Sequence, residues 1–179
     1  MSERAAELAA LDTLAAAAAR LSSHALREIV VDLRALIEQA VADARPVTRR
    51  HGGDLIIEGA FPSMSCDPPL LGSAFAALVR RALSACESAG VAPVLVITGH
   101  LGRDNDPLVV TLADNGTAPE ADGSGLEIDE ARSTVRRFDD LERLLVERII
   151  GRHHGTIVFG TSAMGGTRVD VTLPGPTSA

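Results

Sequence analysis

Apolar residues recur at helical spacing in four stretches of the chain, the first of which is rich in alanine. Residues 2–27 place apolar or small side chains at alternating intervals of three and four, close to a heptad seam. The seam positions are Leu8, Leu11, Ala15, Ala18 and Ser22. Alanine buries little area, so the seam is weak, yet it can pair with a second copy of itself. We therefore expect a separate N-terminal helix, residues 1–28, that is able to dimerise.

Three further stretches predict helices that could cover a sheet. Asp32 is expected to cap the first, Pro46 to bend or interrupt it, and His-Gly-Gly at 51–53 to end it. Its apolar face consists of Leu33, Leu36, Ile37, Ala40, Val41 and Ala44. The second helix opens with Pro68-Pro69 and runs to about Ser88. Its buried stripe is Leu71, Phe75, Leu78, Ala82 and either Ala85 or Cys86. Residues 139–152 form the third amphipathic pattern.

Short runs rich in branched apolar residues predict strands between these helices. They are residues 54–58, 94–100, 108–113, 156–160 and 167–173, with a short apolar piece at 29–31. We expect a loop over residues 62–69 and a mobile, lid-like loop over the polar residues 115–138. Glycine-rich TSAMGG should join the last two strands as a hairpin. This order predicts an α/β fold, a two-layer sandwich whose mixed sheet carries helices on one face.

Composition removes several classes of function. The chain has 179 residues, 46% of them hydrophobic, only 2% aromatic, and a net charge of −7. Few aromatics to stack on bases and a negative charge argue against a nucleic-acid partner. Cys66 and Cys86 have no metal-binding spacing and are expected to be reduced core thiols. The N-terminal stretch carries charges unlike a signal peptide or a membrane span, so we expect a cytoplasmic protein without a membrane partner.

The sequence LADNG at 112–116 follows an alternating strand pattern and has two interpretations. It is a turn if Asn115 and Gly116 adopt positive φ. It is a ligand site if the Asp114 carboxylate accepts a hydrogen bond from a base that the glycine allows to approach. The five residues alone do not decide between the two.

Four segments together resemble a known family. They are VDLRALIEQAV, the helix after CDPPLL, LADNG, and VERIIGRHHGTIVFGTSAMGGTRVDVTLP. The set is similar to the ATP-binding domain of bacterial sensor histidine kinases, the GHKL ATPase fold, over about residues 30–174. The resemblance implies one such domain at 29–175 and a tail at 176–179. It also implies that Asp114 reads the adenine amino group, that Gly116 lets the base come close, and that Thr167 lies near the adenine.

The same resemblance exposes departures at the metal and phosphate end. The helix that usually reads N-x-x-x-N-A here has Ala77 and Arg81 at the two asparagine positions. Alanine offers Mg²⁺ no oxygen ligand, and a guanidinium would repel it. Asp140 and Glu142 replace two glycines of the loop whose backbone would cradle phosphate. A Gly-Ser-Gly-Leu at 123–126 could be a relocated phosphate loop, although flexibility explains it more simply.

Histidines and arginines supply the remaining candidates. SHALRE at 23–28 resembles the phosphoacceptor segment of sensor kinases, which would make His24 a phosphoacceptor; the simpler interpretation is a surface residue on a dimerisation helix. His153 and His154 are adjacent and are expected to end a helix rather than bind metal. Arg80 and Arg81 could form an anion site, close the pocket by pairing with Asp114, Asp140 or Glu142, or form a surface pair. No metal site is expected.

The favoured hypothesis is a degenerate histidine-kinase-like domain that acts as a protein-binding adaptor or regulator in bacterial two-component-type signalling. It expects no cofactor, a response regulator or kinase as partner, and a homodimer. The alternatives are an ATP-binding histidine kinase domain, or an ATP-independent histidine phosphotransferase that uses His24. In those cases the protein would be an enzyme, and for the first of them ATP and Mg²⁺ would be its cofactors.

Overall fold

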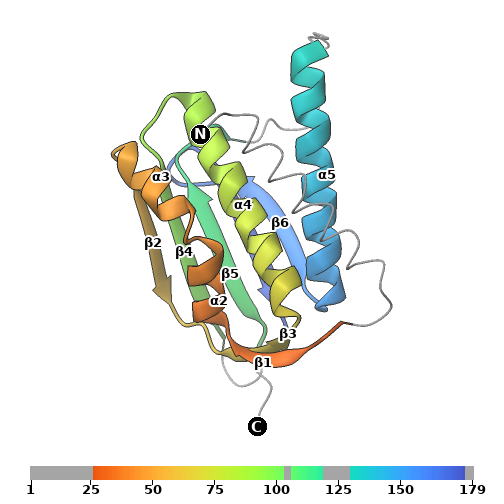
Figure 1. Cartoon of the computed structure of the whole chain (residues 1–179). Helices are drawn as coiled ribbons and strands as arrows, with labels where there is room; N and C mark the ends of the chain where they lie inside the picture. The colour runs from red at the N-terminus through yellow and green to blue at the C-terminus, as the bar shows by residue number, and fades with distance from the viewer. Residues whose placement is uncertain (1–25, 103–105, 119–129, 176–179) are drawn as a thin grey trace.

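The protein folds as a two-layer sandwich in which helices cover one face of a five-stranded sheet (Figure 1). The structure is a computed structural model that describes residues 26–102, 106–118 and 130–175, with side chains of the last segment described from residue 140. The helices are α2 (Leu33–Ala40), α3 (Ala44–Arg50), α4 (Pro68–Ala89) and α5 (Glu130–Arg152). The predicted α/β sandwich is confirmed.

The sheet is mixed because one edge strand runs parallel to its neighbour. Its order is β2 (Asp54–Gly59), β4 (Val94–Leu101), β5 (Leu108–Asp114), β7 (Thr167–Leu173) and β6 (Thr156–Thr161). Only the β2–β4 pairing is parallel, and the other three are antiparallel. A separate ribbon pairs β1 (Ile29–Asp32) with β3 (Ser63–Cys66). Because β5 and β7 are antiparallel neighbours, the end of β5 lies beside the start of β7.

The core lies between the sheet and the helices. Alternate residues of the central strands point inward, such as Ile97, Val110 and Val171, and each is fully buried. Among the described residues, Phe75 of α4 is the largest fully buried side chain. Burying each such side chain contributes about 1.5–3 kcal/mol, and α4 alone supplies nine buried residues to the core.

Helix ends follow the capping chemistry of the sequence. The side chain of Asp32 accepts a hydrogen bond from the backbone N–H of Ala35 and caps α2. Asp67 caps α4 in the same way through Leu70, with proline in the first turn, where its missing N–H costs nothing. Gly90 ends α4 in the left-handed conformation with φ of 67°. The predicted starts of both helices are confirmed.

Two expectations are corrected. Residues 63–66 are the strand β3 and not part of a loop; Met64 and Cys66 alternate inward, and the strand is stabilised by pairing with β1. Helix α5 begins at Glu130, so the last nine residues of the expected loop at 115–138 are helical. The N-terminal helix, His24 and the glycine motif at 123–126 lie outside the described residues.

Pro46 interrupts its helix as predicted, but the break comes one turn earlier. Helix α2 ends at Ala40 and α3 starts at Ala44, so Pro46 lies in the first turn of α3. A proline ring clashes with the carbonyl of the residue four positions before it, here Ala42. A continuous α-helix through Ala42 is therefore excluded, and the helix is interrupted between Ala40 and Ala44.

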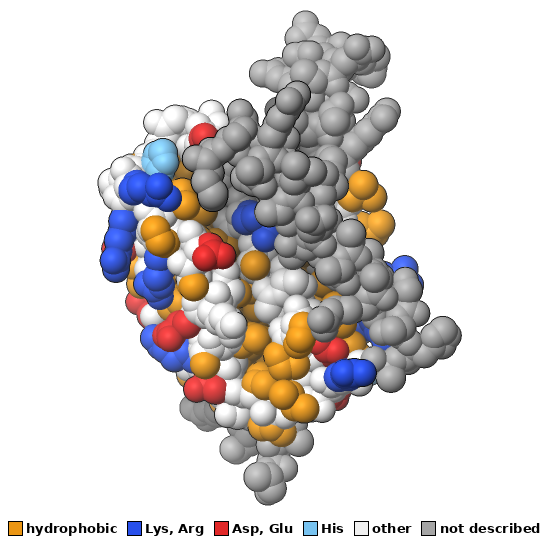
Figure 2. Space-filling model, viewed as in Figure 1, with side chains coloured by type: hydrophobic (Ala, Val, Ile, Leu, Met, Phe, Trp, Pro, Cys, Tyr) orange, Lys and Arg blue, Asp and Glu red, His pale blue; other side chains and the backbone are white. Residues whose placement is uncertain are grey.

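The face that carries the helices is unevenly covered with charge (Figure 2). Arginine side chains gather at its left side, over the region of α2 and α3, and apolar side chains gather at its lower end near β1. Ile29 and Val30 of β1 are 58% and 68% exposed. Among the described residues, no helix is both long enough and apolar enough to cross a bilayer.

Candidate functional site

A buried carboxyl group lies at the end of β5. Asp114 is 3% exposed, and its Oδ1 accepts hydrogen bonds from the backbone N–H of Gly116 (2.8 Å) and of Thr167 (3.1 Å). Burial raises the pKa of Asp114, while these two hydrogen bonds and the nearby guanidinium of Arg81 act in the opposite direction. The carboxyl group is therefore fixed in orientation by the two strands that meet there.

Two glycines allow the backbone to close around this carboxyl group. A Cβ at Gly116 would lie 2.6 Å from the backbone of Ala85 and Cys86 in α4. A Cβ at Gly166 would lie 2.2 Å from Oδ1 of Asp114. Neither glycine has positive φ, and nor does Asn115. The LADNG segment is thus not a left-handed turn; its glycine is needed for the close approach of β5 to α4.

Asn115 has a structural role that its sequence context did not predict. Its Oδ1 accepts from the backbone N–H of Val94 (2.8 Å) and from the Cys86 thiol (3.3 Å), and its Nδ2 donates to the carbonyl of Ala92 (3.0 Å). The side chain joins the end of β5 to the end of α4 and the start of β4. Its partners are distant in sequence, so no local motif could have shown them.

A second group of residues lies between α4, α5 and β6. The lining residues are Ala77, Leu78, Arg81, Glu142, Arg143, Val146 and Phe159. They leave a cleft of about 10 Å³, which is room for roughly one water. Small-molecule sites usually measure about 300–1,000 Å³, so this cleft has far less room than such a site.

Ionic and cation–π contacts close this cleft. Arg80 of α4 donates to Glu142 of α5 at 2.6 Å, with side chains 39% and 18% exposed. The guanidinium of Arg143 lies 4.6 Å from the centre of the Phe159 ring, and that of Arg81 lies 5.8 Å from it. Phe159 is thus covered from two helices, a contact that the sequence patterns did not indicate.

Three of the four departing positions meet in this cleft, and the fourth does not. Ala77, Arg81 and Glu142 line it, whereas Asp140 is exposed on α5 and is not among the lining residues. Residues 140–143 lie inside α5, well after its start at Glu130. Their backbone N–H groups are therefore used within the helix, and only a helix N-terminus has free N–H groups to offer an anion.

His153 fixes the C-terminal end of α5 against the N-terminal end of α4. It is 3% exposed; its Nε2 accepts from the backbone N–H of Asp67 (3.0 Å), and its Nδ1 contacts the carbonyl of Ile149 (2.8 Å). Accepting at Nε2 requires the proton on Nδ1, so the ring donates to Ile149. His154 follows with φ of 58° and ends the helix. No group of three or more potential metal ligands occurs within the described part of the chain.

Comparison with known proteins identifies the architecture. No protein-family model matches the chain. Solved structures match it well: the histidine kinase AdeS of Acinetobacter baumannii (15% identity, 93% of this chain, 76% of that one, TM-score 0.66) and the ATP-binding domain of PrrB from Mycobacterium tuberculosis (22%, 84%, 99%, TM-score 0.62). The chain has the fold of a histidine-kinase ATP-binding domain. Full-length ShkA, solved with AMPPNP, shares this ATP-binding-domain fold with 97% of the chain at a TM-score of 0.71 and 18% identity, over 37% of its own length.

A curated relative points in the same direction. The C4-dicarboxylate transport sensor protein DctS of Rhodobacter capsulatus is 26% identical over 162 residues, which cover 82% of this chain. The chain spans about a fifth, 22%, of the length of DctS. Asp114, Gly116 and Thr167 lie together where the end of β5 meets the start of β7. Ala77, Arg81 and Glu142 lie together in the closed cleft.

Proposed function

We propose that this ATP-binding-domain fold works in bacterial two-component signalling as a protein-binding adaptor or regulator, without catalysis by Mg-ATP. The observation that carries the proposal is the Arg80–Glu142 ion pair, which joins α4 to α5 beside the cleft. Likeness to sensor kinases supports the signalling context. The closed cleft supports the loss of catalysis.

The chemistry of the cleft supports the absence of a metal-bound triphosphate. Mg²⁺ takes six oxygen ligands in near-octahedral geometry. The face of α4 presents a methyl group from Ala77 and a cation from Arg81, and neither is a ligand. Glu142 has the only carboxylate among the lining residues, and Arg80 already neutralises it. A triphosphate would also lie against that carboxylate and against a part of α5 whose N–H groups are used within the helix.

The expected partner is a response regulator or a kinase of the same pathway. The basis is the kind of protein that the chain resembles: DctS is a sensor protein and AdeS a histidine kinase. A domain that keeps this fold without the chemistry can still present the surfaces that such proteins contact. Direct pull-down with purified receiver proteins tests the identity of the partner.

Isothermal titration calorimetry with the full chain tests the proposal. ATP with Mg²⁺ should give no binding heat, whereas an active histidine kinase domain titrated in parallel should bind. Micromolar affinity for Mg-ATP would overturn the proposal. Incubation with γ-labelled ATP adds a second readout: label in the wild-type chain that disappears in His24→Ala would favour the kinase alternative.

A further inference from the structure

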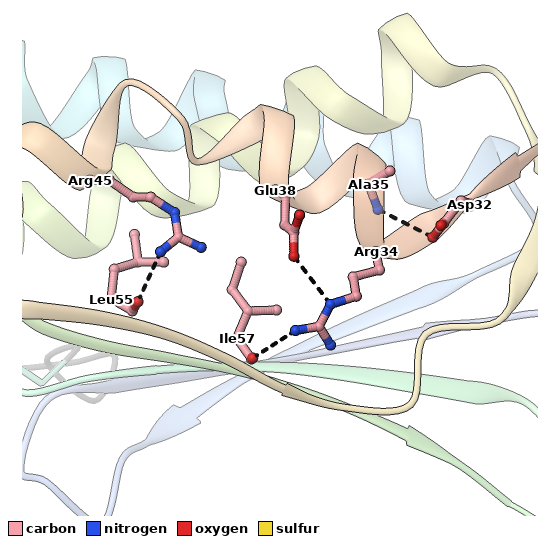
Figure 3. Close-up of polar contacts among 7 residues, drawn as sticks. All are labelled: Asp32, Arg34, Ala35, Glu38, Arg45, Leu55 and Ile57. Carbon is pink, nitrogen blue, oxygen red and sulfur yellow. Dashed lines mark hydrogen bonds and ion pairs between the residues drawn. The ribbon is translucent and has the colours of Figure 1, made fainter.

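One edge of the sheet is protected by arginine side chains (Figure 3). Strand β2 is the outermost strand on that side. The carbonyl oxygen of Leu55 accepts from Arg45 (3.5 Å), and that of Ile57 accepts from Arg34 (3.2 Å). Arg34 is itself held by Glu38 at 3.1 Å. Covering an edge strand with charged side chains from neighbouring helices hinders another strand from pairing with it.

The opposite edge of the sheet is a strand without charged residues of its own. Within the described part of the chain, β6 is the outermost strand there and pairs with β7 alone. The backbone register of β6 runs along β7 from Thr156 to Thr161. Its sequence, TIVFGT, contains no charge and no proline, and Val158 is 61% exposed. Every second residue of such a strand directs its N–H and C=O away from the sheet, which leaves them available to another strand.

We infer that β6 pairs in an antiparallel manner with β6 of a second copy of this chain. A two-fold axis through Val158 places it opposite Val158 of the other copy. The same register sets Ile157 opposite Phe159 of the other copy on the face that carries the helices. Both are apolar pairs of the kind that stabilise adjacent strands. This register is allowed whichever alternate residues of β6 direct their backbone outward.

The helical layer is compatible with this pairing. A two-fold axis normal to the sheet keeps the helices of both copies on the same side, and α5 is the outermost helix at the β6 edge (Figure 1). At 100° per residue, Leu144 lies about 200° around α5 from Glu142, which faces α4. Leu144 is 61% exposed and is thus turned away from α4, toward the second copy.

The contact uses neither the closed cleft nor residues 1–28. It therefore goes beyond the proposed function, and the two can fail independently. A six-residue strand pair with a single leucine contact buries less area than a typical stable dimer, so the dimer should be weak and depend on concentration.

Cysteine cross-linking tests the register. In the full-length Val158→Cys protein, the two introduced side chains should lie about 4.5–5.5 Å apart across the axis and form a disulfide under mild oxidation. Thr161→Cys is the matched control on the same exposed strand. Its two copies should lie about 20 Å apart at ~3.3 Å per residue and should not cross-link. Cys66 and Cys86 are buried and should not interfere. Equal cross-linking of both variants, or none of Val158→Cys, would refute the pairing.

Sedimentation velocity on charge variants provides a second, independent readout. Val158→Lys places two ammonium groups opposite each other and should weaken self-association about tenfold. Ile56→Lys is the matched control, since Ile56 is also exposed, at 38%, but lies on the protected edge strand β2. That variant should associate like the wild-type chain. Circular dichroism establishes that both variants fold. An unchanged association constant in Val158→Lys would overturn the inference.

Discussion

Asp114 is a buried acid whose hydrogen bonds matter more to the fold than its charge. Two backbone N–H groups depend on its Oδ1, and burial raises its pKa. Asp114→Asn keeps an acceptor oxygen and removes the buried charge, so its free energy of unfolding at pH 7 should equal or exceed that of the wild-type chain. Asp114→Ala leaves both N–H groups unpaired and should lose about 1–3 kcal/mol. Urea denaturation measures both.

The pH dependence of stability tests whether the fold favours the protonated form of Asp114. Because the folded state holds the proton more tightly than the unfolded state, the wild-type chain loses stability as pH rises from the ordinary pKa of an aspartate through the raised value. Asp114→Asn lacks this loss. The stability difference between the two should therefore grow in favour of asparagine with rising pH. A difference that shrinks would mean that the charged form is stabilised in the fold.

His154 is strained by its backbone conformation. Its φ of 58° lies in the left-handed region, where a side chain costs energy that glycine avoids. His154→Gly should raise the free energy of unfolding by about 0.5–1 kcal/mol, measured by thermal denaturation. The neighbouring Gly155→Ala is the contrast, because a Cβ there would lie 2.4 Å from the Thr172 carbonyl oxygen. That change should destabilise, and equal effects at both positions would contradict the explanation.

How far the site could be foreseen differs from residue to residue. The resemblance placed Asp114, Gly116 and Thr167 together, and the structure brings them within hydrogen-bond distance, although an adenine-reading role stays a prediction. Asn115 was interpreted only as a turn residue, because its partners on α4 and β4 come from other parts of the chain. Local sequence carries the identity of a group but not the partners that folding brings to it.

Among the helices and strands, the predictions were wrong where pairing or packing, and not the local sequence, decides the structure. The four residues of β3 have a weak periodicity and become a strand through β1. Residues 130–138 are mostly polar, and their helical state extends the amphipathic helix that the sequence predicts from residue 139. Long apolar patterns such as α4 were predicted well, because a helix of 22 residues repeats its signal several times.

The arginine contacts to the carbonyls of the edge strand β2 lead to a testable prediction. Arg34→Ala combined with Arg45→Ala frees the carbonyls of Leu55 and Ile57, so a second strand could pair there. We expect the double variant to form larger species, measured by light scattering. The control is Arg49→Ala with Arg50→Ala, which removes the same charge from the exposed end of α3 and should leave the size unchanged. An equal increase in both variants would trace the effect to net charge.

For the whole molecule, the sandwich carries the two halves of the nucleotide site that the resemblance predicts, and the two halves differ in how their residues are held. The strand ends keep Asp114, Gly116 and Thr167 together, because the Asp114 carboxylate accepts from two backbone N–H groups and glycine lets the backbone close around it. The other half depends on what α4 and α5 present to each other, and here they present an ion pair and a covered aromatic ring. The fold therefore persists while the volume between its helices is occupied by side chains.

Ligand-linked stability tests this view of the whole molecule. A ligand present at 100 times its Kd stabilises the folded state by about 2.7 kcal/mol. For a chain of this size that corresponds to a rise in Tm of roughly 5–11 °C. With millimolar ATP and Mg²⁺ we expect no such rise, because the cleft holds about one water and lacks metal ligands. The Asp114→Ala variant is the control, because it removes the carboxylate predicted to contact adenine and keeps any nonspecific stabilisation by ATP and Mg²⁺. A rise in the wild-type chain that this variant abolishes would mean that nucleotide enters after all and that the closed cleft opens in solution.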